Sequence, residues 1–307
     1  MYIDILVKQF CSNASFMKGY SPDTVKRYTA NLRLFTGLTG ISEVEAVTDE
    51  AVRSFFFRGR SERQWSPATF ITYLKSLRVF FRWCVKEGYL TTNPAEYIEK
   101  PALEKKIPLK LTREEALRLL ELIDNYPWSE PFLRRRNHAI FAVFIFAGLR
   151  RKELLHLSLA DINVDNQTIL VRKGKGGKDR YVPVCPPLAD SLRRYLVERA
   201  RLHKTCPEFF ASHAQNCGLT DNGFKYLLNL IVKSFGKKFS AHKLRHTFAT
   251  LMLEGGCDIY SLSTMMGHSD ISTTTIYLTA TAEHLRGQMS KHPLCREGWA
   301  RGPSTEL

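Results

Sequence analysis

The sequence is poor in acidic residues and lacks a long apolar run. Asp and Glu number 30 against 45 Lys and Arg, so the formal net charge is +15. This balance favours a polyanionic partner and argues against acidic small molecules as the sole ligands. The longest apolar run, residues 139–149, is eleven residues long, whereas roughly 18 are needed to span a bilayer. We therefore expect a buried core helix there and no membrane partner.

Cysteine pairs and an export leader are also missing. The seven cysteines are scattered, odd in number and free of any Cys-x-x-Cys pair, which is typical of a reduced, intracellular protein. Cys206, His213 and Cys217 lack the spacing of a zinc finger. The N-terminus has no basic segment followed by a sustained apolar run, so we do not expect a secretory signal.

The length of 307 residues makes two domains the default expectation. Residues 98–111 contain two prolines and several charged side chains without periodicity, which is typical of a linker. This linker separates a domain at residues 1–97 from one at residues 112–292. The tail, residues 293–307, has no apolar periodicity and is expected to be disordered.

Helical patterns dominate both predicted domains. Four helices are expected in the first, at residues 3–16, 22–37, 47–58 and 67–88; two of them begin with Ser-Pro, a capping hydroxyl followed by a proline suited to the first helical position. A capping box, Thr112 to Glu115, opens the second domain. Further helices are expected at residues 112–123, 131–147, 150–157, 187–203, 220–235, 241–254 and 258–265.

One segment of the second domain has the pattern of β-strands instead of the helical periodicity seen elsewhere. Residues 168–172 and 180–184 are short β-branched runs that flank a glycine-rich segment with three lysines, which predicts a hairpin. The chain is therefore expected to be mainly α with a small β-hairpin or sheet, in two domains.

Residues 240–277 gather side chains that could hold and attack a phosphodiester. His242 and Arg245 lie three apart at the start of a helix, so they share one face. A helix N-terminus favours anions, and an imidazole and a guanidinium beside it would form a phosphate site. His268 follows the next helix, and Tyr277 follows a run of hydroxyl side chains. Each of these residues also has a simpler interpretation: the His-x-x-Arg spacing can occur by chance, and Tyr277 can be an ordinary core tyrosine.

Two further cations lie upstream. Arg150 directly follows the apolar run, where a guanidinium needs either a carboxylate or a bound anion. Glu153 offers the structural alternative, a helical ion pair. Lys175 lies at the glycine-rich hairpin tip, where the backbone can approach a phosphate; the spacing there is not that of a P-loop, and an ordinary solvated hairpin is the alternative.

The order and spacing of these residues resemble those of the tyrosine recombinase family, the lambda-type integrases and Xer-like recombinases. The matching positions are Arg150 in the first arginine box, Lys175 in the hairpin, His242 and Arg245 in the His-x-x-Arg box, His268 after Gly267, and Tyr277 as nucleophile. The similarity spans about residues 112–292, and residues 1–97 resemble the family's helical, SAM-like core-binding domain. Arg151 and Lys152 depart from the pattern, which usually has an apolar and a small residue there.

The resemblance implies a site-specific DNA recombinase that cleaves and rejoins strands through a 3′-phosphotyrosyl intermediate, without metal or cofactor. Tyr277 would attack the phosphorus, while Arg150 and Arg245 would hold its two non-bridging oxygens. The remaining implied roles are general acid for Lys175, base for His242, a phosphate hydrogen bond for His268, and orientation of the arginines for Glu153.

The resemblance also implies partners. These are double-stranded DNA with an inverted-repeat recombination site, and a homotetramer on two duplexes or a heterotetramer with a second recombinase. Base reading is expected from basic residues of two N-terminal helices, Lys26, Arg27, Lys75 and Arg78, although a solvated charged face is the alternative.

Because the chain opens directly on the core-binding helices, an Xer-like or mobile-element enzyme is favoured, cytoplasmic and nucleoid-associated. The alternatives are a type IB topoisomerase-like enzyme and a catalytically silent DNA-binding regulator.

Overall fold

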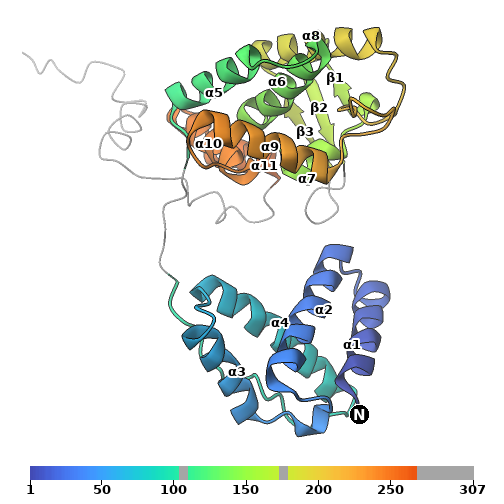
Figure 1. The fold of residues 1–307 in the computed structure, drawn as a ribbon, viewed down its shortest axis with the longest axis vertical. Coiled ribbons are helices and arrows are strands. Elements are labelled where there is room, and N and C mark those ends of the chain that lie inside the picture. The colour runs from blue at the N-terminus through green and yellow to red at the C-terminus, as the bar shows by residue number, and fades with distance from the viewer. Residues whose placement is uncertain (104–109, 173–178, 268–307) are drawn as a thin grey trace, which may run out of the picture. The chain divides into compact units, whose positions relative to one another are not determined.

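The computed structural model describes residues 1–103, 110–172 and 179–267. The chain forms two compact units, Met1–Lys106 and Ile107–Leu307. The described residues are mainly helical with one small sheet, as predicted (Figure 1). No helix among them is long and apolar enough to cross a membrane. The predicted hairpin tip and tail, with Lys175, His268 and Tyr277, lie outside the described residues.

The first unit contains the four predicted helices. They are α1 (Ile3–Ser12), α2 (Pro22–Thr39), α3 (Asp49–Ser61) and α4 (Pro67–Lys86). The first α-helix is shorter than predicted because the chain continues as a π-helical turn, Asn13–Met17. A short 3₁₀ turn, Val44–Ala46, precedes α3. Ser21 and Ser66 cap α2 and α4 through their hydroxyl oxygens, as the Ser-Pro pairs predict.

Aromatic side chains fill the core of the first unit. Phe10 packs edge-to-face against Phe80, and Phe35 against Phe55 and Phe81, with ring centroids 5.1–5.8 Å apart. All five rings are at most 2% exposed. Such edge-to-face pairs add to the free energy gained from burying apolar area, so this small unit has a well-packed core of its own.

The second unit surrounds one central helix. Its helices are α5 (Arg113–Asn125), α6 (Pro131–Phe146), α7 (Arg151–Leu155), α8 (Pro186–Arg201), α9 (Asp221–Phe235), α10 (Ala241–Glu254) and α11 (Ile259–Met266). Helix α6 packs against α5, α8 and α10 (Figure 1). It carries most of the apolar run, and the buried core helix predicted there is confirmed. The capping box of Thr112 and Glu115 also forms.

The sheet is antiparallel, in the order β1 (Ile162–Asn163), β2 (Thr168–Val171), β3 (Arg180–Pro183). Ile169 lies opposite Val182 and Val171 opposite Arg180, and all four side chains are buried. Strands β2 and β3 are the two predicted flanks of the hairpin. Strand β1 was not predicted, because two residues are too few to show a period.

The segments on either side of residues 104–109 belong to different cores. Ile98 packs into the first core. Leu111 packs into the second, and its backbone N–H donates to the hydroxyl of Thr247 at 2.9 Å. The division into residues 1–97, 98–111, 112–292 and 293–307 stays a prediction.

Candidate active site

The turn after α6 places two arginines from distant parts of the chain side by side. Gly148 has a φ of +60°, and a Cβ on it would lie 2.2 Å from the ring of Phe248, so only glycine fits there. Its carbonyl accepts a hydrogen bond of 2.7 Å from Arg245 Nη1 on α10. Two residues later, Arg150 occupies the N-cap of α7. The turn therefore brings Arg150 and Arg245 to one place.

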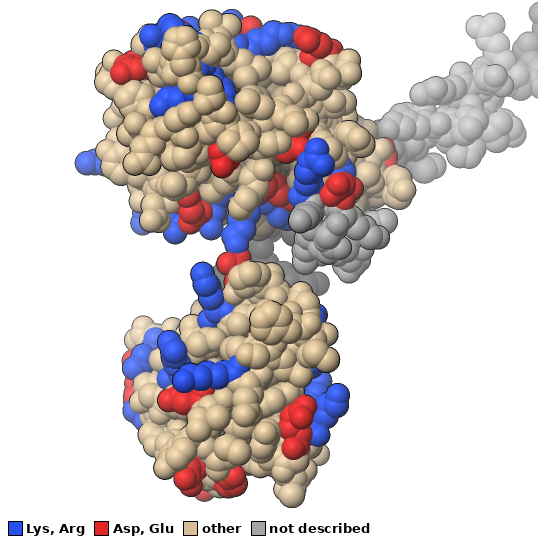
Figure 2. Space-filling view, turned by 90° about the vertical axis from the view of Figure 1, so that its right-hand side faces the viewer, with Lys and Arg blue, Asp and Glu red and all other residues tan. Residues whose placement is uncertain are grey.

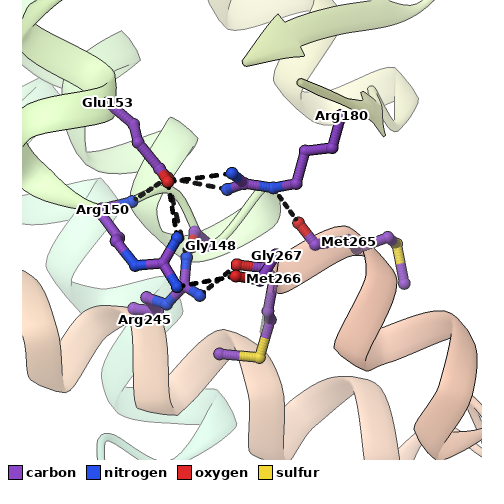
Figure 3. Close-up of polar contacts among 8 residues, drawn as sticks. All are labelled: Gly148, Arg150, Glu153, Arg180, Arg245, Met265, Met266 and Gly267. Atoms are coloured by element: carbon purple, nitrogen blue, oxygen red, sulfur yellow. Dashed lines mark hydrogen bonds and ion pairs between the residues drawn. The ribbon is translucent and has the colours of Figure 1, made fainter. Parts of the chain in front are cut away.

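The carboxylate of Glu153 lies at the centre of three arginines (Figure 3). Arg150 donates to it from Nη1 at 2.7 Å. Arg180 donates with both Nη atoms, at 2.9 and 2.8 Å. Arg245 Nη1 lies 3.9 Å from Oε2. The Arg150–Glu153 ion pair that the spacing predicts is present, but Glu153 is shared more widely than a helical pair would be.

Three successive carbonyls at the end of α11 accept from the same three arginines. Met265 O accepts from Arg180 Nε at 2.7 Å, Met266 O from Arg245 Nη2, and Gly267 O from Arg150 Nη2 at 3.0 Å. The last carbonyls of a helix lack partners within the helix and form the negative end of its dipole. Each arginine is thus placed between Glu153 and the α11 terminus (Figure 3).

The charges of this cluster leave it net positive. Burial alone would raise the pKa of Glu153, but the hydrogen bonds and charge of Arg180, followed by the hydrogen bonds of Arg150, lower that pKa to about 2. The side chain is 8% exposed, and it stays ionised at neutral pH. One carboxylate among three guanidinium groups leaves an excess of positive charge, which suits a phosphodiester.

Two histidines on α10 lie beside the arginines. The rings of His242 and His246 are 4.2 Å apart and nearly perpendicular. Burial, with the charges of Arg245 and Arg150, lowers the pKa of His242. Burial and the charges of His242 and Arg245 lower that of His246 to about 4. Both imidazoles are therefore neutral at neutral pH, so His242 can accept a proton.

Sequence reasoning missed Arg180 and His246. Arg180 occupies an inward position of β3, where alternation with the apolar Val182 marks it as a buried charge. His246 lies one turn after His242 on the same helix, and the i, i+4 spacing places both rings on one face. Arg151 forms a salt bridge of 3.1 Å with Asp221 on α9, which accounts for a charge at a position where the family pattern is apolar.

The predicted site residues fall into two groups. The structure brings together Arg150, Glu153, His242 and Arg245. The other three, Lys175, His268 and Tyr277, lie outside the described residues. Arg180 on β3 follows Lys175 by five residues and Gly267 directly precedes His268, and both belong to the arginine cluster.

The predicted DNA-reading residues lie on α2 and α4. Arg27, Lys75 and Arg78 line a cavity of about 460 Å³. However, the guanidinium of Arg78 donates to the carbonyls of residues 95, 96 and 98 at 2.9, 2.7 and 2.6 Å, which fixes the segment after α4 onto that helix. These contacts give Arg78 a structural role in the first unit, and base reading by Lys26, Arg27, Lys75 and Arg78 stays a prediction.

Comparison with known proteins decides the family. Residues 110–284 match the Phage integrase family, and residues 6–90 match the Phage integrase, N-terminal SAM-like domain. The chain belongs to the phage integrase family. The resemblance to tyrosine recombinases seen in the sequence is confirmed, as are the two-part fold and the enzyme class.

Members of the phage integrase family with Xer names are similar over nearly the whole chain. Tyrosine recombinase XerC of Oceanobacillus iheyensis is 34% identical over 301 residues, which cover 95% of this chain and 97% of the relative. Tyrosine recombinase XerA of Thermococcus kodakarensis is 34% identical over 278 residues, covering 91% and 92%.

Solved structures of such integrases share the fold. XerH site-specific recombinase bound to difH substrate in a pre-cleavage complex has a TM-score of 0.71 at 25% identity, covering 93% of this chain and 83% of that one. The Tn1549 transposon integrase in complex with circular intermediate DNA has a TM-score of 0.74 at 18% identity, covering 94% and 99%.

Proposed function

We propose that the arginine cluster around Glu153 holds the scissile phosphate of a DNA recombination site, and that this Xer-like site-specific recombinase exchanges strands there. One observation supports this most directly. Arg150 and Arg245, distant in the sequence, are held between one buried carboxylate and one helix terminus, next to a neutral His242. Two fixed guanidinium groups match the two non-bridging oxygens of a phosphodiester.

The proposed chemistry is transesterification. The phenol oxygen of Tyr277 attacks the scissile phosphorus while its proton passes to His242. The bond from phosphorus to the 5′-oxygen breaks, and Lys175 donates a proton to that oxygen. The products are a 3′-phosphotyrosyl link and a free 5′-hydroxyl. A 5′-hydroxyl from the second duplex then attacks the link in reverse, so a strand is joined without ATP.

The arginines act on the charge that develops at phosphorus. Donors placed in advance at the non-bridging oxygens stabilise the transition state more than the ground state, each by on the order of 10²-fold in rate. In this proposal Arg150 and Arg245 are those donors and Glu153 orients them, while His268 adds a hydrogen bond. The low pKa of Glu153 supports its role in orienting the arginines, because the carboxylate stays charged at neutral pH.

The DNA partner is supported by charge and by the relatives. XerH and the Tn1549 integrase, which share this fold, were solved with DNA. The chain carries +15 net charge, and Lys and Arg side chains lie on the visible face of both units (Figure 2). In this proposal residues 1–97 bind DNA, with Lys26, Arg27 and Lys75 reading bases, and residues 112–292 cleave it.

The assembly follows from the reaction. Exchange between two duplexes requires four cleavages, so we propose a homotetramer on two inverted-repeat sites, or a heterotetramer with a second recombinase, in the cytoplasm and close to the nucleoid. A type IB topoisomerase would instead relax one duplex, and a silent regulator would only bind.

Strand exchange between two labelled linear duplexes tests the function. A site that the protein itself selects from a random-sequence duplex library provides the substrate. We expect joined products that contain strands from both duplexes, and none from Tyr277→Phe at equal DNA binding. Relaxation of supercoils without joined products would identify a topoisomerase, and binding without any cleavage would identify a regulator.

A further inference from the structure

Arg180 makes more contacts within the arginine cluster than its position on an edge strand would suggest. Both Nη atoms bind Glu153 and Nε binds the carbonyl of Met265, all at 2.7–2.9 Å. Its side chain is 8% exposed. A guanidinium is placed in a buried position only when several partners compensate its desolvation. Here the partners come from α7 and α11, so one residue of β3 joins three elements.

We propose that Arg180 is a positioning residue for strand cleavage: it fixes Glu153 and the end of α11 so that Arg150 and Arg245 are held ready for the phosphate. This inference rests on the proposed function. Arg150 binds Glu153 and the Gly267 carbonyl. Arg245 binds the carbonyls of Gly148 and Met266 and lies 3.9 Å from Glu153. Arg180 binds both Glu153 and an α11 carbonyl and sets the distance between them.

The fork of a guanidinium is required for this role. Arg180 spans both carboxylate oxygens with two nitrogens while a third reaches a different element. A lysine ammonium is a point charge without that planar fork, so it cannot reproduce all three contacts in fixed geometry.

The chain at Gly267 is built closely around Arg180. Gly267 has a φ of +63°, and a Cβ on it would lie 2.9 Å from Arg180 Nη1. The backbone of Gly267 therefore lies directly against this guanidinium. Loss of the guanidinium would remove this packing surface and, two residues earlier, the hydrogen bond to the Met265 carbonyl.

Removing Arg180 should also change how the site responds to pH. Among the described residues, Arg150, Arg180 and Arg245 are the charged groups that face Glu153 from α7, β3 and α10, and His242 lies beside Arg150 and Arg245. Arg180 contributes the largest of the effects that lower the pKa of Glu153. Without it, burial raises that pKa, and protonation of Glu153 on the acid side releases Arg150.

The experiment measures single-turnover formation of the covalent protein–DNA complex on a nicked duplex that carries the selected site, across about pH 5 to 8. The variants are Arg180→Met and Arg180→Lys. Arg201→Met is the matched control, because Arg201 is an exposed arginine of α8 that pairs with Glu198. DNA affinity and melting temperature are measured for each protein.

We expect Arg180→Met to slow cleavage by about 10- to 100-fold at saturating DNA, by comparison with outer residues that orient metal ligands. Its DNA affinity should remain within about threefold of wild type, because only positioning is lost. Its rate should fall further as the pH is lowered, whereas wild type and Arg201→Met should show no such added fall. Arg180→Lys should be intermediate in rate.

Two results would overturn the inference. One is wild-type rate and pH dependence in Arg180→Met. The other is a wild-type rate in Arg180→Lys, which would show that the three-way contact is not needed. This second variant retains the charge, so it still tests the inference if Arg180→Met does not fold. Failure of the wild-type protein to form any covalent complex would instead count against the proposed function.

Discussion

Glu153 illustrates how one buried carboxylate can organise several cations. Three guanidinium groups would repel one another if they were brought together alone, and each would lose hydration. Glu153 offsets part of that repulsion, and the α11 carbonyls provide hydrogen bonds at the negative end of a helix. Residual positive charge remains, and it is available for the anion that the site is proposed to bind.

The histidines give the fold a pH dependence of calculable sign. The pKa of His246 is about 4 in the folded chain and 6.5 in its ordinary state. Between those values the unfolded chain binds the proton more readily, so the free energy of unfolding should fall as pH drops from 6.5 towards 4. Urea unfolding of wild type and His246→Gln across that window measures this contribution.

His246→Gln should lose less stability over the window than wild type does. The exposed His156 provides the matched control, and His156→Gln should lose as much as wild type. Equal pH dependence in His246→Gln and wild type would show that His246 titrates normally in the folded chain.

At the scale of elements, the ends of helices decide where the arginines lie. Gly148 ends α6 in a left-handed conformation, and its carbonyl binds Arg245. Gly267 ends α11 in the same conformation, and its carbonyl binds Arg150. In both places the glycine permits a turn that other residues resist, and the carbonyl freed at that turn holds an arginine of the cluster.

Gly148→Ala should therefore be costly. The added Cβ meets Phe248 at 2.2 Å and φ is positive, so we expect a loss of about 2 kcal/mol or more in the free energy of unfolding. DNA cleavage should also be slower, because displacement of the carbonyl at position 148 removes one of the hydrogen bonds that hold Arg245. Gly37→Ala is the matched control. It lies inside α2 with no atom near the added Cβ and should be neutral or stabilising by up to about 1 kcal/mol. Equal stability of both variants would contradict this account of the turn.

Elements with local signals could be predicted from the sequence. Three helices begin at a signal of two to four adjacent residues, a Ser-Pro pair or the Thr112 capping box. All three begin where those signals predict. Strand β1 and the π-helical turn after α1 could not be predicted, because pairing with β2 and packing in the first core determine them. Local sequence propensity includes neither strand pairing nor tertiary packing.

At the scale of the whole molecule, the site is a meeting of segments far apart in the chain. Arg150 comes from the start of α7, Arg180 from β3, Arg245 from α10, and their shared carbonyls from α11. Motif spacing identified Arg150 and Arg245 because the family pattern contains them. Alternation with Val182 could mark Arg180 as a buried charge, but its pairing with Glu153 could be recognised only once β3 was seen against α7 and α11.

The same distinction applies to the basic residues of the first unit. Basic residues on α2 and α4 suggest DNA binding in sequence, but the sequence cannot show which of them are already engaged within the protein. Arg27, Lys75 and Arg78 line one cavity, but Arg78 is also engaged with three backbone carbonyls. Only the structure shows that this arginine also holds the fold together.

If the arginine cluster delivers a phosphodiester to Tyr277, the cleavage intermediate trapped on a nicked duplex should be linked to that residue, and mass spectrometry of the DNA-linked peptide locates the link. We expect one adduct, on Tyr277, absent from Tyr277→Phe and greatly reduced in Arg150→Ala and Arg245→Ala while all four proteins still bind the duplex. An adduct on another residue, or one that persists in Tyr277→Phe, would contradict it.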